Sequence, residues 1–184
     1  MAKKIAIGGD HAGFEYKAKM VSKLESLGYE VKDFGPFTDA SVDYPDYVHP
    51  LSSAIEAGEF DLGIVICGSG NGVAITANKH QGIRAALCWN EELAALSRQH
   101  NNANVIALPA RFISYELAEK LAETFLTTDF RFGLFFFRFR GSFYKFTVPF
   151  ATWLARIKAL YKLAILPDLE ISEKFFSAPS GPPT

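Results

Sequence analysis

The sequence has few cysteines and lacks a long uninterrupted apolar run. Cys67 and Cys88 are the only cysteines among 184 residues, too few for a disulfide scaffold, so we expect a reducing, cytoplasmic location. No long apolar stretch follows the N-terminal lysines, which argues against a secretory signal. Basic residues interrupt every 18-residue window of the apolar C-terminal part, which argues against a membrane-spanning helix. No His or Cys pair has zinc-ligand spacing, so we expect neither a metal nor a cofactor.

Net charge is also nearly absent, at −1, but the two parts of the chain differ. Residues 1–130 contain 11 basic and 17 acidic side chains, whereas residues 131–184 contain 8 and 3. Ten of the 17 phenylalanines lie in the second part. We therefore expect one domain over residues 1–130, a usual size for a single fold, followed by an atypical Phe-rich basic tail over residues 131–184.

Within residues 1–130, short β-branched runs alternate with longer segments of helical periodicity. The expected strands are Lys4–Gly8, Tyr29–Phe34, Leu62–Cys67, Ile83–Cys88 and Asn104–Leu108. The expected helices are Phe14–Leu27, Pro45–Glu56, Gly72–Lys79, Glu91–Gln99 and Ser114–Leu126. This alternation is typical of an α/β fold, and we predict a Rossmann-like three-layer α/β/α sandwich around a five-stranded parallel sheet. Ligands of such sheets bind at the carboxyl ends of the strands.

A glycine-rich loop, Gly68 to Gly72, follows the third expected strand and opens a helix. Glycines let backbone N–H groups turn inward, so this loop suits an anion or a developing oxyanion. It lacks the lysine of a P-loop, and the loop Gly8–Gly13 does not fit the dinucleotide fingerprint. The alternative interpretation is a plain tight turn between a strand and a helix.

Two side chains near the expected loops could move protons. Cys67 ends a buried strand next to the glycine loop, which makes it a candidate base or nucleophile; the alternative is a small buried apolar residue, our interpretation of Cys88. His100 lies in a polar stretch, SRQHNN, expected as the loop before the fifth strand, and could act as an acid or be a plain surface histidine. With Arg111 after the fifth strand, this set suits proton abstraction next to a carbonyl, giving an enediolate. Acyl transfer through Cys67 is the competing chemistry.

Four segments together resemble a known family: IAIGGDHAGFEYK, DYPDY, GIVICGSGNGVAITANKHQGIRAALC and LSRQHNNANVIALPAR. In order and spacing, residues 3–130 resemble ribose-5-phosphate isomerase type B, a sugar-phosphate isomerase family that includes galactose-6-phosphate isomerase subunits. The resemblance implies metal-free interconversion of ribose 5-phosphate and ribulose 5-phosphate, a pentose phosphate pathway step, through an enediol. It also implies a homodimer, or a dimer of dimers, whose active sites use residues of both subunits. The alternatives are an isomerase of galactose 6-phosphate or allose 6-phosphate, or a sugar-phosphate-binding protein that has lost catalysis.

The resemblance also assigns roles to residues. Cys67 would be the base that moves the proton between C1 and C2, and His100 the acid that helps open the furanose ring. The loop that holds the enediolate would consist of Gly68, Ser69, Gly70, Asn71 and Gly72. The remaining contacts to the sugar or its phosphate would come from Asp10, His11, Tyr44, Asn101 and Arg111.

The resemblance ends near Phe130. The family continues with a motif E-G-G-R-H-x-x-R-V, whose two arginines clamp the substrate phosphate. Aligned without gaps, Leu134 takes the place of the first arginine and Arg138 that of the second, so one phosphate ligand is missing. A frameshift or misjoined gene would explain the foreign composition of the tail. A basic aromatic segment lying on a membrane surface is an alternative, and a nucleic-acid partner is not expected. A helix is predicted around residues 150–165 and a disordered end at residues 177–184.

Overall fold

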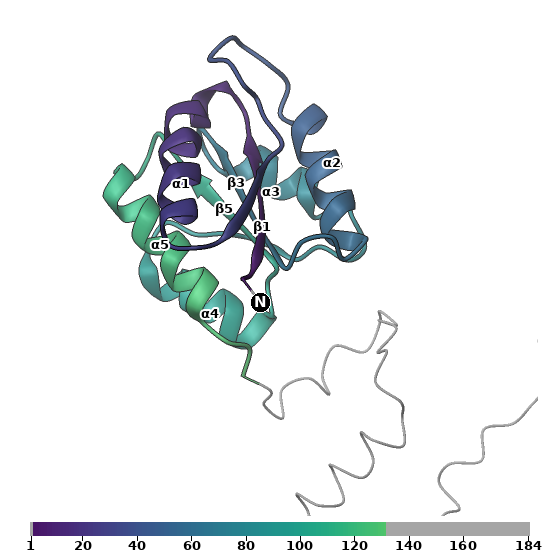
Figure 1. The fold of residues 1–184 in the computed structure, drawn as a ribbon, viewed down its shortest axis with the longest axis vertical. Helices are drawn as coiled ribbons and strands as arrows, with labels where there is room; N and C mark the ends of the chain where they lie inside the picture. The colour runs from purple at the N-terminus through teal and green to yellow at the C-terminus, as the bar shows by residue number, and fades with distance from the viewer. Residues whose placement is uncertain (1, 132–184) are drawn as a thin grey trace, which may run out of the picture. The chain divides into compact units, whose positions relative to one another are not determined.

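A five-stranded parallel sheet forms the middle layer of the computed structural model, which describes residues 2–131 (Figure 1). The strands are β1 (Lys4–Gly9), β2 (Glu30–Asp33), β3 (Leu62–Cys67), β4 (Ala85–Leu87) and β5 (Val105–Pro109). Their order across the sheet is β2-β1-β3-β5-β4, and every pairing is parallel. The predicted sheet is confirmed, with β4 shorter at both ends than expected.

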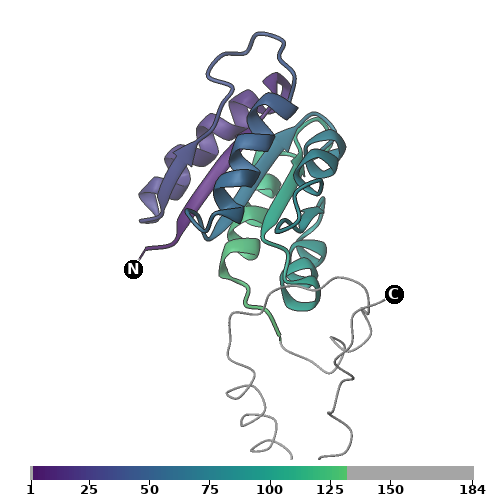
Figure 2. The same cartoon turned by 90° about the vertical axis from the view of Figure 1, so that its right-hand side faces the viewer.

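Helices cover both faces of the sheet. They are α1 (Phe14–Ser26), α2 (Pro45–Glu56), α3 (Asn71–Ala77), α4 (Glu91–Asn101) and α5 (Tyr115–Thr127). One buried cluster joins the sheet to α1, α4 and α5, and a second joins it to α2 and α3. Figure 2 looks onto the face that α2 and α3 cover. The predicted three-layer sandwich is therefore confirmed.

The central strand β3 shows why the chain folds into three layers. All six of its residues are buried, and side chains alternate between the two faces of a strand. Ile64 and Ile66 belong to the cluster under α1, α4 and α5, whereas Val65 and Cys67 belong to the cluster under α2 and α3. Each fully buried aliphatic side chain stabilises the fold by about 1.5–3 kcal/mol. The same alternation places Cys67 on the α2 and α3 side.

The order in which successive strands are added to the sheet reverses between β1 and β3. Two glycines, one in β1 and one just after it, let the chain come close to β3 there. A Cβ atom at Gly9 would lie 1.9 Å from the carbonyl oxygen of Ile66, and one at Gly13 would lie 2.5 Å from it. The backbone N–H of Asp10 donates to that same oxygen at 3.1 Å. The loops after β1 and β3 are thereby held side by side at the topological switch point, where open α/β sheets bind ligands.

The prediction that Ser97–Asn102 forms a loop was wrong. The helix α4 continues through Asn101 and ends at Asn102, which takes the left-handed conformation with φ 46°. The Arg98 guanidinium donates to the Asn102 side chain at 3.1 Å, and Ser97 donates to the Ala94 carbonyl at 2.8 Å. These polar side chains therefore satisfy groups within and at the end of the helix instead of interrupting it.

Several predictions fall outside the described residues. These are the helix around residues 150–165, the disordered end at residues 177–184, and the positions of Leu134 and Arg138. Within residues 2–131, none of the helices is long and apolar enough to cross a membrane.

Candidate active site

A cavity of about 360 Å³ lies at the carboxyl edge of the sheet, beside the switch point. This volume falls in the range of small-molecule sites. The lining residues come from the loops after β1, β3 and β5 and from the start of α2. They are Asp10, His11, Ala12, Tyr44, Cys67, Gly68, Ser69, Gly72, Arg111 and Phe112. The structure thus brings together eight of the thirteen residues predicted for the site.

Cys67 lies at the inner wall of this cavity with only 4% of its surface exposed. Its Sγ atom accepts a hydrogen bond from the backbone N–H of Gly70 at 3.1 Å. Gly70 has φ 73°, and a Cβ atom there would lie 2.3 Å from a methyl carbon of Leu87. Only glycine allows this turn, and the turn directs a backbone N–H group at the sulfur.

Cys88, the other cysteine, differs in its surroundings. It lies just after β4, 1% exposed, and the cavity does not include it. Burial raises the pKa of its thiol to about 11, although a hydrogen bond with Ser97 lowers it somewhat. A thiol with that pKa stays protonated at neutral pH, so it is not a base or a nucleophile. This agrees with our interpretation of Cys88 as a small buried apolar residue.

Asp10 and His11 form the wall that follows β1. The Asp10 carboxylate accepts hydrogen bonds from the N–H groups of Ala12 at 2.9 Å and Gly13 at 3.1 Å. The Nδ1 atom of His11 accepts from the backbone N–H of Val42 at 3.3 Å. A nitrogen that accepts a hydrogen bond carries no proton, so this contact selects the tautomer with its proton on Nε2. His11 therefore offers a fixed N–H donor to a ligand.

Arg111 and Tyr44 each lie directly over a glycine of the loop after β3. A Cβ atom at Gly68 would be 3.1 Å from Cδ of Arg111, and one at Gly72 would be 2.7 Å from Cζ of Tyr44. The backbone N–H of Arg111 also donates to the backbone carbonyl of Gly68 at 3.0 Å. The glycines leave room for a guanidinium group, a good partner for a phosphate, beside the Cys67 loop.

The rest of the predicted loop turns partly away from the cavity. The Ser69 hydroxyl accepts from the N–H of Asn71 at 3.3 Å, and both residues are exposed. Ser69 lines the cavity, whereas Asn71 and Gly70 do not. Gly72, predicted in the loop, is the second residue of α3. Within the described residues, no three His, Cys, Asp or Glu side chains are placed to hold a metal ion.

His100 and Asn101 are not near this cavity in one chain. They form the last turn of α4 and precede β5, whereas the cavity lies beyond the carboxyl end of β5. The length of β5 alone separates these two edges by about 13 Å. Figure 1 shows α4 reaching toward the end of the sheet at which β1 begins. The sequence-based interpretation of His100 and Cys67 as neighbours in one reacting set was therefore wrong for a single chain, in which the side chains of His100 and Asn101 are exposed at the opposite end of the sheet.

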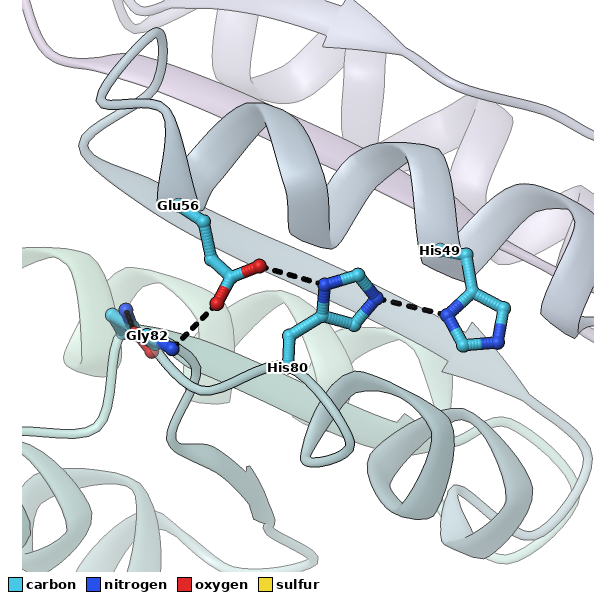
Figure 3. Close-up of polar contacts among 5 residues, drawn as sticks. His49, Glu56, His80 and Gly82 are labelled. Atoms are coloured by element: carbon cyan, nitrogen blue, oxygen red, sulfur yellow. Dashed lines mark hydrogen bonds and ion pairs between the residues drawn. The ribbon is translucent and has the colours of Figure 1, made fainter. Parts of the chain in front are cut away.

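The sequence did not indicate two residues that line the cavity, nor a row of three hydrogen-bonded side chains outside it. Ala12 and Phe112 also line the cavity, and Phe112, which follows Arg111 directly, is 75% exposed. Outside the cavity, Nδ1 of His49 lies 2.8 Å from Nε2 of His80, and Nδ1 of His80 lies 2.8 Å from Oε2 of Glu56 (Figure 3). His49 and His80 are 31 positions apart, so no local pattern could have joined them.

Glu56, the last side chain of this hydrogen-bonded row, leads us to expect that the stability of the fold depends on pH. Its pKa lies below the ordinary value of 4.5, first because its carboxylate accepts the Gly82 N–H and second because of the hydrogen bond with His80. A lowered carboxylate pKa stabilises the fold above pH 4.5, and this contribution is lost as the pH falls through the lowered pKa. We expect Glu56→Gln to unfold at a lower temperature than the wild type at pH 7, with the gap narrowing below about pH 4.

Thermal unfolding at several pH values measures this gap, and the exposed Glu59 provides a matched control. Glu59→Gln should show no such gap. A gap for Glu56→Gln that is the same at pH 7 and pH 3 would contradict the assigned role of the carboxylate charge.

Comparison with known proteins agrees with this fold. The family model for ribose/galactose isomerase matches residues 5–134. Ribose-5-phosphate isomerase B of Escherichia coli (strain K12) is 44% identical over 131 residues, which cover 71% of this chain and 88% of the relative. The crystal structure of a ribose 5-phosphate isomerase from Thermotoga maritima is 48% identical, with a TM-score of 0.71, and covers 73% of this chain and 92% of that one. Ribose-5-phosphate isomerase B of Clostridium thermocellum is 41% identical, with a TM-score of 0.71, and covers 86% and 97%.

The fold, the cavity at its switch point and the match over most of the length of these relatives together define the protein as an isomerase. The chain belongs to the ribose/galactose isomerase family.

Proposed function

We propose that this protein interconverts ribose 5-phosphate and ribulose 5-phosphate through an enediolate, a step of the pentose phosphate pathway. The observation that carries the proposal is the Cys67 sulfur, which accepts the Gly70 N–H at 3.1 Å in the wall of a cavity that Arg111 also lines. A base, a cluster of backbone N–H groups and a cation for the phosphate are what this reaction requires. The names of the relatives in E. coli and T. maritima support ribose 5-phosphate as the substrate.

The reaction follows from these groups. The Cys67 thiolate removes the proton from C2 of the open-chain aldose, and the electrons of that bond form the double bond between C1 and C2. Negative charge then develops on the sugar oxygens, where N–H groups of the loop from Gly68 to Gly72 stabilise it. The Cys67 thiol returns the proton to C1, and the proton of O2 passes to O1, which gives the ketose. His11 and Arg111 hold the phosphate, and Asp10 and Tyr44 contact the sugar.

Opening of the furanose ring requires an acid, and we propose that a second copy of the chain supplies it. His100 and Asn101 are exposed at the far edge of their own sheet, available to another molecule. In a homodimer, His100 of the partner subunit would donate a proton to the ring oxygen. The partner subunit's Asn101 would contact the sugar. A twofold dimer would contain two such shared sites.

The preferred substrate distinguishes this proposal from its nearest alternative, an isomerase that acts on another aldose phosphate. We expect purified full-length protein to convert ribose 5-phosphate with kcat/KM at least about tenfold above that for allose 6-phosphate or galactose 6-phosphate, because one sugar carbon more must fit the same cavity. Ketose formation from each substrate is the measurement. A preference for either hexose phosphate would contradict the proposal, and calorimetric binding of ribose 5-phosphate without turnover would favour a binding protein.

The proposed compartment is the cytoplasm. Both cysteines are free thiols, and a cysteine that acts as a base must remain reduced, as it does in a reducing compartment.

A further inference from the structure

Lys17 of α1 is a buried lysine outside the cavity. Only 2% of its side chain is exposed, and its ammonium group forms an ion pair with the carboxylate of Asp33 at the end of β2. Two aromatic rings lie beside the ammonium, with centroids 5.8 Å away for Phe14 and 5.6 Å away for Phe37. A buried ammonium group is strongly unfavourable unless it is paired in this way. Asp33 and the two rings therefore hold the Lys17 ammonium at a fixed position.

The partner of Lys17 connects it to the loop after β1. The second oxygen of Asp33 accepts the backbone N–H of Gly35 at 2.8 Å. The Gly35 carbonyl accepts the N–H of Gly9 at 3.0 Å, and Gly9 is the residue directly before Asp10 of the cavity. Three interactions therefore lead from the buried ammonium to the wall of the site.

Lys17 also holds the beginning of a segment that reaches the site at its other end. Residues 34–44, which we call the site strap, contain no helix or strand and connect β2 to α2. Phe37 in the strap is 70% exposed, yet its ring lies over the Lys17 ammonium. Further along, the Val42 N–H donates to Nδ1 of His11, and Tyr44 lines the cavity. A segment without regular structure is ordered only by such contacts.

We propose that Lys17 is a positioning residue for the isomerase reaction. By pairing with Asp33 and lying under Phe37, it fixes the site strap on α1, so that Val42 selects the tautomer of His11 and Tyr44 closes over Gly72. It does not touch the substrate. This inference rests on the proposed function, but the tautomer of His11 can be measured without any turnover.

Lys17→Met tests the inference because it keeps an apolar stem and removes the charge. We expect KM for ribose 5-phosphate to rise about tenfold with a smaller change in kcat, since binding contacts of the strap are lost. In the substrate-free protein, nitrogen NMR of the imidazoles should show His11 changing from one tautomer to a mixture. Lys17→Arg, which keeps the charge, should restore the single tautomer.

Lys19→Met is the matched control on the same helix. The Lys19 ammonium lies 5.3 Å from the ring centroid of Tyr115 on α5, away from the strap, so neither KM nor the His11 tautomer should change. An unchanged KM and a single His11 tautomer in Lys17→Met would overturn the inference. A changed tautomer in a protein without isomerase activity would support the positioning role and contradict the proposed function.

Phe37→Ala decides the question if Lys17→Met does not fold. The Phe37 side chain is mostly exposed, so its removal leaves the core intact. We expect a rise in KM of about two- to threefold and a partial loss of the single His11 tautomer, because a cation–π contact is only part of the attachment. Wild-type values for both quantities in Phe37→Ala would overturn the inference in that case.

Discussion

Cys67→Ala is expected to lower kcat for the isomerisation of ribose 5-phosphate by about 10³-fold or more, because a positioned general base contributes about 10²–10⁴-fold and no second thiol lines the cavity. The fold should survive, since alanine removes one buried sulfur at a cost of about 1–2 kcal/mol. The measurement is ketose formation, together with exchange of the C2 proton for deuterium from solvent. Both rates should fall together if Cys67 removes this proton.

Cys88→Ala is the matched control for this result. Cys88 is buried directly after β4, but its thiol has a raised pKa of about 11 and lies outside the cavity. Its removal should therefore leave kcat within about twofold of the wild type. Normal deuterium exchange in Cys67→Ala would show that another group acts as the base.

A mixed dimer of one Cys67→Ala chain and one His100→Asn chain is expected to have about half the activity of the wild-type dimer, although each variant alone is nearly inactive. One of its two sites contains Cys67 from one chain and His100 from the other, and the second site lacks both. Coexpression with two affinity tags and purification on both gives the mixed dimer directly. Steady-state turnover of ribose 5-phosphate, a substrate whose ring must open, is the measurement.

The matched control places both substitutions on one chain and pairs it with a wild-type chain. If the sites are shared, this dimer has no complete site and should be nearly inactive. If each chain used its own His100, the two results would be reversed, with the control half active and the first mixed dimer inactive. That reversal would contradict the shared site, as would a protein that remains monomeric at assay concentrations.

The sequence predicted the sheet and most of the cavity because those features depend on local patterns. Strand β3 is apolar along its whole length, as a strand covered on both faces must be. Asp10 and Arg111 follow the carboxyl end of a strand and Cys67 is the last residue of one, and parallel strands bring such residues to one edge. Their proximity therefore followed from the order of the elements alone.

The location of His100 did not follow from its polar surroundings. A connection that precedes a strand lies at the amino end of that strand, and α4 returns along the sheet for about 14 Å before it reaches His100. The amides around His100 indicated exposure correctly, but not the edge of the sheet at which it is exposed. Local sequence likewise could not indicate the hydrogen-bonded row of His49, His80 and Glu56. These side chains meet only because α2 packs beside the segment that follows α3.

By itself, the sequence determined the α/β architecture and the glycine turn at Cys67, and it predicts a domain over residues 1–130 followed by a tail of different composition. Only the tertiary structure decided that Lys17 is buried, that Val42 fixes His11 and that Asn101 and His100 lie away from their own cavity. The physical reason is the range of the interactions involved. Apolar periodicity and glycine geometry act within a few residues, whereas ion pairs, tautomers and shared sites depend on which distant segments the folded chain brings together.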